Sequence, residues 1–184
     1  MIYLKWSIQN IIVWIAMILA VLLAPIAAFT ANSEGRLIRP LRWMETHDVL
    51  GWSGPLSERK VAEWYHKYGK RVAMTRWLMR NKAYSLRYNI FGKEIDEQTS
   101  ISMTGTFIAK RRGFSYRLLK AIKEGKTVAF EYEIRVGFGI GIGMFYFRMG
   151  WKLAPFFDDM KRKGIAVFQP LTPRTDDWDD YDLG

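Results

Sequence analysis

The stretch TVAFEYEIRVGFGIGIGMFYFRMGWK, Thr127 to Lys152, alternates apolar and polar side chains on both sides of a glycine-rich centre. Successive side chains of an extended strand point to opposite faces, so a period of two indicates a half-buried strand. The two arms therefore predict an antiparallel hairpin. Its apolar face should pack on a core, and Glu131 and Glu133 should lie on a polar face, solvated and balancing nearby bases.

Four glycines occupy alternate positions at the centre of this stretch, at residues 137, 139, 141 and 143. A dinucleotide-binding loop needs G-x-G-x-x-G between a strand and a helix, and a P-loop ends in G-K-[ST], so neither pattern fits. Glycine packing between membrane helices needs a spacing of four. The glycines therefore predict the reversal of the hairpin rather than a ligand-binding loop.

The position of that reversal decides which residues face each other across the hairpin. A type II′ turn carries glycine at its first central position, so residues 139–140 and 141–142 both qualify. A turn at the first pair sets Glu131 opposite Arg148, whereas a turn at the second pair sets Arg135 opposite the same arginine. Because like charges oppose strand pairing, we predict the first register.

Outward from the hairpin, the pattern predicts more strands and then helices. SISMTGTFIA and FSYRLL also alternate, and the chain after Lys152 predicts a short turn or helix followed by a small edge strand. From Ser57 to Arg80, apolar residues instead recur every three or four positions, which is typical of amphipathic helices, and Gly69 interrupts them. The predicted fold class is α+β, with basic amphipathic helices and a small antiparallel β-sheet.

The N-terminal segment IIVWIAMILAVLLAPIAAF, Ile11 to Phe29, is almost continuously apolar. About 20 helical residues cross a hydrocarbon core, so this segment predicts an uncleaved single-pass transmembrane helix, which Pro25 would kink or end. A cleaved signal peptide is the alternative. Only Lys5 precedes the span, whereas three arginines follow it closely, at positions 36, 39 and 42. The positive-inside rule then predicts a cytoplasmic C-terminal domain.

The chain is expected to divide into a transmembrane anchor (1–33), a juxtamembrane connector (34–56), a basic α+β domain (57–169) and an acidic, disordered tail (170–184). The net charge is +10, and between Gly35 and Thr175 there are 27 Lys and Arg against 12 Asp and Glu. Such an excess attracts polyanions, either anionic lipid or nucleic acid. Seven bases are the predicted polyanion-binding residues: Arg76, Arg80, Lys82, Arg87, Arg111, Arg112 and Arg148.

Several kinds of chemistry are disfavoured by the composition. The chain has no cysteine and two histidines, which removes disulfides, thiolate metal sites and a cysteine nucleophile, and we expect no metal and no cofactor. Glu131 with Glu133, and Asp48 beside His47, are the acids that a hydrolase would use. Nothing in their spacing indicates a cleft, so no catalytic residue is assigned.

Three segments together resemble a family of small uncharacterised membrane-associated proteins of tailed bacteriophages. PLRWMETHDVLGWSG carries W-x-x-T-x-D, RWLMRNKAYSLRYNIFG carries W-L-x-R-N-x-A-Y, and FRMGWK carries R-x-G-W-K, over roughly residues 39–153. His47 and Lys82 stand where the family commonly has proline. The motif residues are Thr46, Asp48, Trp77, Arg80, Asn81, Tyr84, Arg148, Gly150, Trp151 and Lys152. The resemblance implies a phage-encoded protein made in a bacterial host, and it carries no activity.

The leading hypothesis is a phage accessory protein in the host inner membrane that acts by binding through its basic domain. Its partners would be the lipid membrane itself, anionic lipid or nucleic acid, and an unidentified phage or host protein. A virion or lysis-associated structural component is one alternative, and a membrane-tethered nucleic-acid-binding protein is another. A membrane-bound enzyme that uses Asp48 or Glu131 is the remaining alternative.

Overall fold

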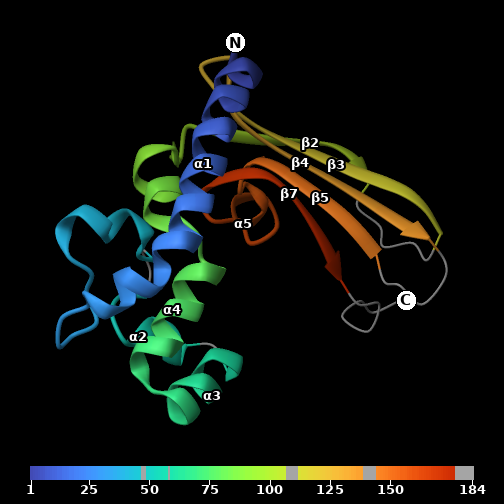
Figure 1. The fold of residues 1–184 in the computed structure, drawn as a ribbon. Coiled ribbons are helices and arrows are strands. Elements are labelled where there is room, and N and C mark those ends of the chain that lie inside the picture. The colour runs from blue at the N-terminus through green and yellow to red at the C-terminus, as the bar shows by residue number, and fades with distance from the viewer. Residues whose placement is uncertain (47–48, 58, 107–111, 139–143, 177–184) are drawn as a thin grey trace. The chain divides into compact units, whose positions relative to one another are not determined.

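The computed structural model describes residues 1–46, 49–57, 59–106, 112–138 and 144–176 (Figure 1). The chain forms two compact units, which we call the sheet unit (Met1–Asn10 with Gly92–Gly184) and the helical unit (Ile11–Phe91). The first helix contributes its N-terminal residues to the sheet unit and the remainder to the helical unit. The predicted α+β class is confirmed: a long apolar helix is followed by shorter helices and an antiparallel sheet.

Helix α1 spans Ile2–Phe29 and continues past Pro25, so the proline does not end it. It starts earlier than the apolar run because no residue between Ile2 and Ile11 breaks a helix. Among the residues described, α1 is the single helix long and apolar enough to cross a membrane. Signal sequences and the core helices of soluble proteins share this length and composition.

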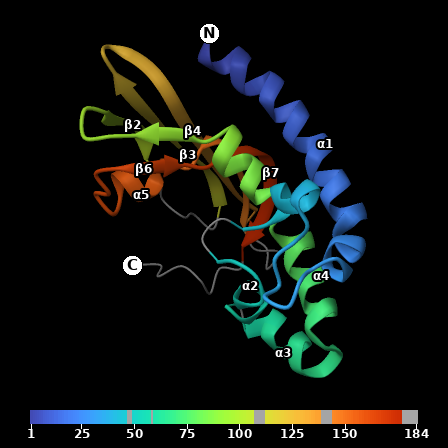
Figure 2. The ribbon, with the colours of Figure 1, turned by 90° about the vertical axis from the view of Figure 1, so that its left-hand side faces the viewer.

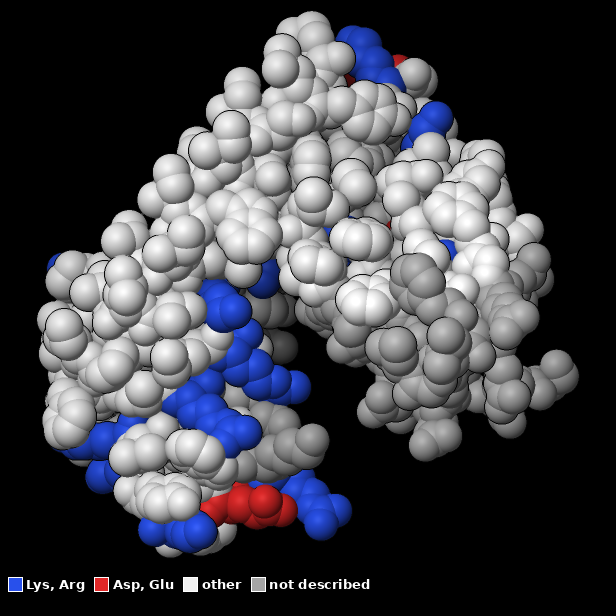
Figure 3. Space-filling model, turned by 45° about the vertical axis from the view of Figure 1, so that its right-hand side comes forward, with Lys and Arg blue, Asp and Glu red and all other residues white. Residues whose placement is uncertain are grey.

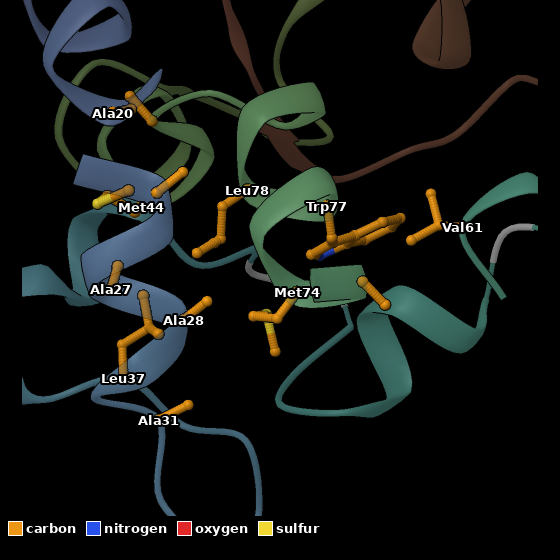
Figure 4. Close-up of a cluster of buried hydrophobic side chains, with 13 residues drawn as sticks. Ala20, Ala27, Ala28, Ala31, Leu37, Met44, Val61, Met74, Trp77 and Leu78 are labelled. Atoms are coloured by element: carbon orange, nitrogen blue, oxygen red, sulfur yellow. The ribbon is translucent and has the colours of Figure 1, made fainter. Parts of the chain in front are cut away.

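The helical unit contains five short elements after α1: the 3₁₀-helix η1 (Arg39–Met44), α2 (Ser53–Leu56), α3 (Arg59–Tyr68), α4 (Lys70–Arg80) and the π-helical η2 (Leu86–Ile90). Gly69 separates α3 from α4 with a φ of +87°, as its position in the sequence predicts. The core of this unit is a cluster in which small residues of α1, Ala20 to Ala28, pack with Met74 and Leu78 of α4 (Figure 4).

The sheet unit contains a five-stranded antiparallel sheet in the order β2-β3-β4-β5-β7. Its strands are β2 (Ser100–Thr106), β3 (Arg112–Lys123), β4 (Lys126–Phe138), β5 (Met144–Trp151) and β7 (Phe168–Asp176). A separate two-stranded sheet pairs β1 (Lys93–Ile95) with β6 (Gly164–Ala166), and the short helix α5 (Ala154–Phe157) follows β5. The chain through α5 and β6 lies against one face of the larger sheet (Figure 2).

Strand β7 extends beyond the predicted end of the ordered domain. It runs through Pro170 and Pro173 as far as Asp176, and Pro173 pairs with Phe147 of β5. Proline lacks the N–H that a central strand must donate, so it is tolerated in an edge strand such as β7. The predicted tail therefore begins later than residue 170, and residues 177–184 lie outside those described.

The hairpin β4–β5 forms as predicted, but in a different register. Glu133 lies opposite Arg148 and Arg135 lies opposite Tyr146, so neither of the two candidate registers is correct. The last described pair joins Gly137 and Met144, with residues 139–143 outside the described range. The observed register therefore lies between the two that were considered, displaced by two residues from each.

The polar face of the sheet is buried, contrary to the prediction. Glu131 and Glu133 are 1% and 0% exposed, whereas Phe114, on the opposite face, is 55% exposed. The prediction of solvated acids is wrong because the chain after β5 covers the polar face. Leu153 donates its backbone N–H to Glu131 from that covering segment.

Candidate functional site

One stripe of α1 exposes large apolar side chains along its whole length. Eight of them, spaced three or four residues apart, are each 55–69% exposed: Leu4, Ile8, Ile11, Ile15, Ile18, Leu22, Ile26 and Phe29. That spacing places them on a single helical face. No residue of α1 after Lys5 is charged, and Lys and Arg gather at the lower left of the space-filling view (Figure 3). We call this face the exposed stripe.

The opposite face of α1 is covered by protein and made largely of small residues. Its buried residues recur at related spacings: Val13, Ala20, Ala24, Ala27 and Ala28. Alanine leaves room for the backbone of a neighbouring helix, and α4 packs there within the helical unit. Arg71 of α4 donates to the carbonyl oxygen of Ala28 at 3.0 Å and to that of Phe29. These bonds satisfy carbonyls that a helix C-terminus leaves without partners.

The N-terminal end of α1 is held by the sheet unit. The indole Nε1 of Trp6 donates to the carbonyl oxygen of Gln169 at 3.2 Å, and its ring lies 5.9 Å from that of Phe130. Asn10 Oδ1 accepts the backbone N–H of Leu171 at 3.0 Å. Strands β4 and β7 therefore fix the first ten residues of the chain.

A hollow of about 590 Å³ lies between this end of α1 and the sheet. Tyr3 and Trp6 line one side, and Tyr116, Tyr132 and Met149 are among the sheet residues on the other. None of the residues that line it is charged. It continues the outward face of the sheet, where Phe114 and Tyr116 are exposed and the side chains of β4 and β5 are half-buried. This face, which we call the outer sheet face, offers an aromatic and aliphatic surface.

The opposite face of the sheet, which we call the inner sheet face, is covered by the chain after β5 and contains a cluster of five charged side chains. Arg117 contacts Glu133 at 3.0 Å and both carboxylate oxygens of Asp158 at 3.0 Å. Arg148 contacts Glu133 directly, and its Nε lies 3.4 Å from Glu131 Oε1. The other oxygen of Glu131 accepts the backbone N–H groups of Leu153 at 2.5 Å and Ala154 at 2.7 Å.

Burial raises the pKa of Glu131, and the neighbouring charge of Glu133 raises it further, while Arg148 and the two N–H donors partly offset the shift. The cluster contains three carboxylates and two guanidinium groups, so a proton on Glu131 would balance its charges. With 1% of its surface exposed, Glu131 is not accessible to a substrate in this structure. The cluster is thus arranged to hold strands β3, β4 and β5 to the segment that covers them.

Four of the predicted polyanion-binding residues lie in the helical unit, close in sequence. Arg76 lies over the ring of Trp64 at 4.1 Å, while Arg80 and Arg87 each lie 5.9 Å from an aromatic ring, of Trp77 and Tyr84. Lys82 lines a small apolar hollow with residues 14–22 of α1. These cations therefore lie beside aromatic and apolar groups rather than projecting freely.

The three other predicted bases belong to the sheet unit. Arg148 is not the exposed cation that was expected, because it is paired with Glu133 on the inner sheet face. Arg112 is the first residue of β3, and Arg111 lies outside the described residues. Polyanion binding by these residues stays a prediction.

The first two sequence motifs meet in the core of the helical unit. Trp77 Nε1 donates to the hydroxyl of Thr46 at 3.4 Å, and a Cβ at Gly54 would lie 2.6 Å from the same indole nitrogen. Asn81 follows α4 and donates its backbone and side-chain N–H groups to the carbonyl of Trp77. Asp48 lies outside the described residues. Thr46, Trp77 and Asn81 therefore contribute to packing and hydrogen bonding within the helical unit.

The third motif, R-x-G-W-K, shapes the end of β5. Gly150 has a φ of +109°, and a Cβ there would lie 2.0 Å from the carbonyl oxygen of Phe130, so only glycine fits. The strand pairing shifts between Arg148 and Gly150, which marks a bulge. Trp151 is fully buried with its ring edge-on to Phe130 and Phe168, and the backbone N–H of Lys152 bonds to Val167.

The chain belongs to a family of unknown function, DUF7338, whose model matches residues 1–176. The match takes in α1, the helical unit and every strand of the sheet unit that the structure describes. No curated protein and no solved structure matches the chain.

Proposed function

We propose that this protein is a membrane-bound binding protein, held on lipid by the exposed stripe of α1. The observation that carries the proposal is a row of eight large apolar side chains, each more than half exposed and with no charge among residues 6–33. Soluble monomers rarely expose a contiguous apolar patch of this extent. If transfer of each half-exposed side chain to lipid contributes roughly 1 kcal/mol, the stripe contributes on the order of 8 kcal/mol.

The proposal includes a bacteriophage origin and a location at the inner membrane of the bacterial host. Support comes from the three segments that resemble proteins of tailed bacteriophages, in residues 39–153. The arginines that follow the apolar segment favour placement of the later chain in the cytoplasm, which with a single crossing gives the topology that the sequence predicts. Anionic lipids of such a membrane are suitable partners for a chain of net charge +10.

Binding is proposed in place of catalysis because two of the acids that an enzyme would use are engaged in ion pairs. Glu131 and Glu133 are buried in ion pairs on the inner sheet face. Arg76, Arg80 and Lys82 carry positive charge in the helical unit, to which residues 11–29 of α1 belong, and they are the groups we propose for anionic headgroups. A phage or host protein at the membrane would be a further partner.

Flotation of the full chain with lipid vesicles tests the proposal. We expect the protein to rise with vesicles of phosphatidylcholine and more strongly with vesicles that contain phosphatidylglycerol. The double variant Ile18→Asn with Leu22→Asn removes two members of the exposed stripe and should weaken binding by roughly 30-fold, which corresponds to about 2 kcal/mol.

The matched control replaces Leu50 and Leu56, which are exposed leucines of the helical unit outside α1, with asparagine. This control should float like the unchanged protein. Failure of the unchanged protein to float with either lipid, or equal weakening by the two double variants, would refute the membrane-bound function.

A further inference from the structure

We infer that α1 lies along one surface of the bilayer, with both ends on the same side, instead of making the single crossing that the sequence predicts. The outer sheet face is then a second lipid contact beside the N-terminal end of α1. The inference rests on the proposed membrane binding and concerns the geometry of that binding.

Each end of α1 is fixed by later parts of the chain. Trp6 and Asn10 bond to the backbone of β7, at Gln169 and Leu171. At the other end, Arg71 bonds to the last carbonyls of the helix. Residues on both sides of the apolar segment are thus in contact with residues that follow it.

A single crossing would separate these contacts. A helix of 28 residues is about 42 Å long, so one crossing would leave Trp6 and Phe29 on opposite sides of the hydrocarbon core. Residues that follow α1 would have to reach both sides. Among the described residues, no second helix is long and apolar enough to carry the chain back. Both sets of contacts are kept if the helix does not cross.

The distribution of residues around α1 also fits a helix at the interface. One face is covered by protein along the helical unit, and the opposite face is uniformly apolar and exposed. Helix α4, which packs on the covered face, carries Lys70, Arg71, Arg76 and Arg80 within eleven residues. A crossing α1 would draw these charges toward the hydrocarbon, where each costs several kcal/mol. A helix that lies in the interface keeps them in the headgroup layer or in water.

The outer sheet face adds a lipid contact of the same chemistry within the sheet unit. The hollow lined by Tyr3, Trp6 and Tyr132 joins the first turns of α1 to this face. Its exposed members include Phe114 and Tyr116. Tyrosine and tryptophan favour the headgroup boundary, where the ring is in an apolar layer and the polar atom is hydrated. Lipid, rather than a second polar domain, therefore matches this surface.

A depth profile of the exposed stripe tests the inference. The chain has no cysteine, so single cysteines at Leu4, Ile11, Ile18 and Ile26 can carry a nitroxide in the otherwise unchanged protein. In vesicles that contain phosphatidylglycerol, oxygen and a water-soluble nickel complex report the depth of each label. We expect all four labels at similar shallow depths, roughly 5–10 Å below the headgroups, and a label at Phe114 also in lipid contact.

Each other outcome has a defined meaning. A depth that is greatest near Ile18 and falls toward both ends would show a crossing helix and overturn the inference, while membrane binding would stand. Labels that never contact lipid would overturn both. The labels could also be protected from water without contacting lipid. If their spin–spin broadening then disappears on dilution with unlabelled protein, a second copy of the chain covers the exposed stripe, and the inference is overturned.

A second measurement compares the side of the membrane on which Lys5, before the apolar segment, and Lys126, in the later chain, lie. Single cysteines at exposed Lys5 and exposed Lys126 are treated with an impermeant maleimide on sealed vesicles of defined orientation. We expect both positions to react from the same side. Reaction of Lys5→Cys and Lys126→Cys from opposite sides would contradict the inference, even in variants whose depth profiles are incomplete.

Discussion

The two faces of the five-stranded sheet are built in opposite ways. The inner face buries Glu131, Glu133 and Arg117 in a network of ion pairs, and the outer face leaves Phe114 and Tyr116 exposed. In a water-soluble sheet with one solvated face, the apolar side chains would be covered and the charges would face water. The difference indicates that mutual pairing satisfies the inner charges, whereas the outer side chains suit the apolar medium that the proposed membrane contact would supply.

The largest expected effect is a difference between the two sheet faces in how much they contribute to the free energy of unfolding. Glu133→Gln removes the carboxylate shared by Arg117 and Arg148 and should lower the free energy of unfolding by about 3 kcal/mol, because each arginine keeps one other acid. Phe114→Thr on the outer face should change it by less than about 1 kcal/mol. Denaturant unfolding in detergent micelles, followed by tryptophan fluorescence, measures both. Equal losses would remove the distinction between the faces.

A smaller effect concerns the bulge in β5, where Arg148 pairs with the glutamates. Gly150→Ala combines a positive φ with a Cβ that would meet the carbonyl of Phe130, so a loss of about 2–3 kcal/mol is expected from backbone strain. Gly125→Ala is the matched control. Gly125 also has a positive φ, of +71°, but no atom lies within 4 Å of an added Cβ, so about 1 kcal/mol should be lost. A similar loss in both variants would show that the close approach at Gly150 has no energetic role.

The smallest effect is a dependence of stability on pH that originates in the inner face. The folded pKa of Glu131 is raised above its ordinary value of 4.5, so the folded state binds more protons than the unfolded state above that pH. The free energy of unfolding should therefore fall as pH rises from 4.5 toward the folded pKa, by up to about 1.4 kcal/mol per unit. Glu131→Gln should lack this component. A wild-type protein whose pH dependence matches that of the variant would contradict the assignment.

The sequence was sufficient to predict the elements of the hairpin but not the side on which it is covered. Alternation from Val128 to Arg135 separates two sets of side chains, but it does not predict which set is covered by the chain that follows β5. That depends on Leu153 and Ala154, which donate backbone N–H groups to Glu131. The signal that was missed is the match in charge between Glu133 on one strand and arginines on both neighbouring strands.

The sequence also predicts the long apolar helix, but it does not predict which parts of the chain pack against that helix. Residues 11–29 indicate a span by length and composition alone. The contacts of Trp6 with β4 and β7 join positions more than a hundred residues apart, which no local pattern contains. The motif residues were found by resemblance, but Trp77 and Gly150 function in packing and in a bulge, which becomes visible only when their partners are known.

The central claim is that the outer sheet face contacts lipid and the covered inner side does not. Quenching of a fluorescent label by lipid, measured on each side of the sheet, tests it most directly. A fluorescent label on Phe114→Cys reports the outer face, and the same label on Asp159→Cys, an exposed position just after α5, reports the covered side. With vesicles that contain nitroxide-labelled lipids, we predict strong quenching at position 114 and almost none at position 159. Equal quenching at both positions, or none at position 114, would contradict the account.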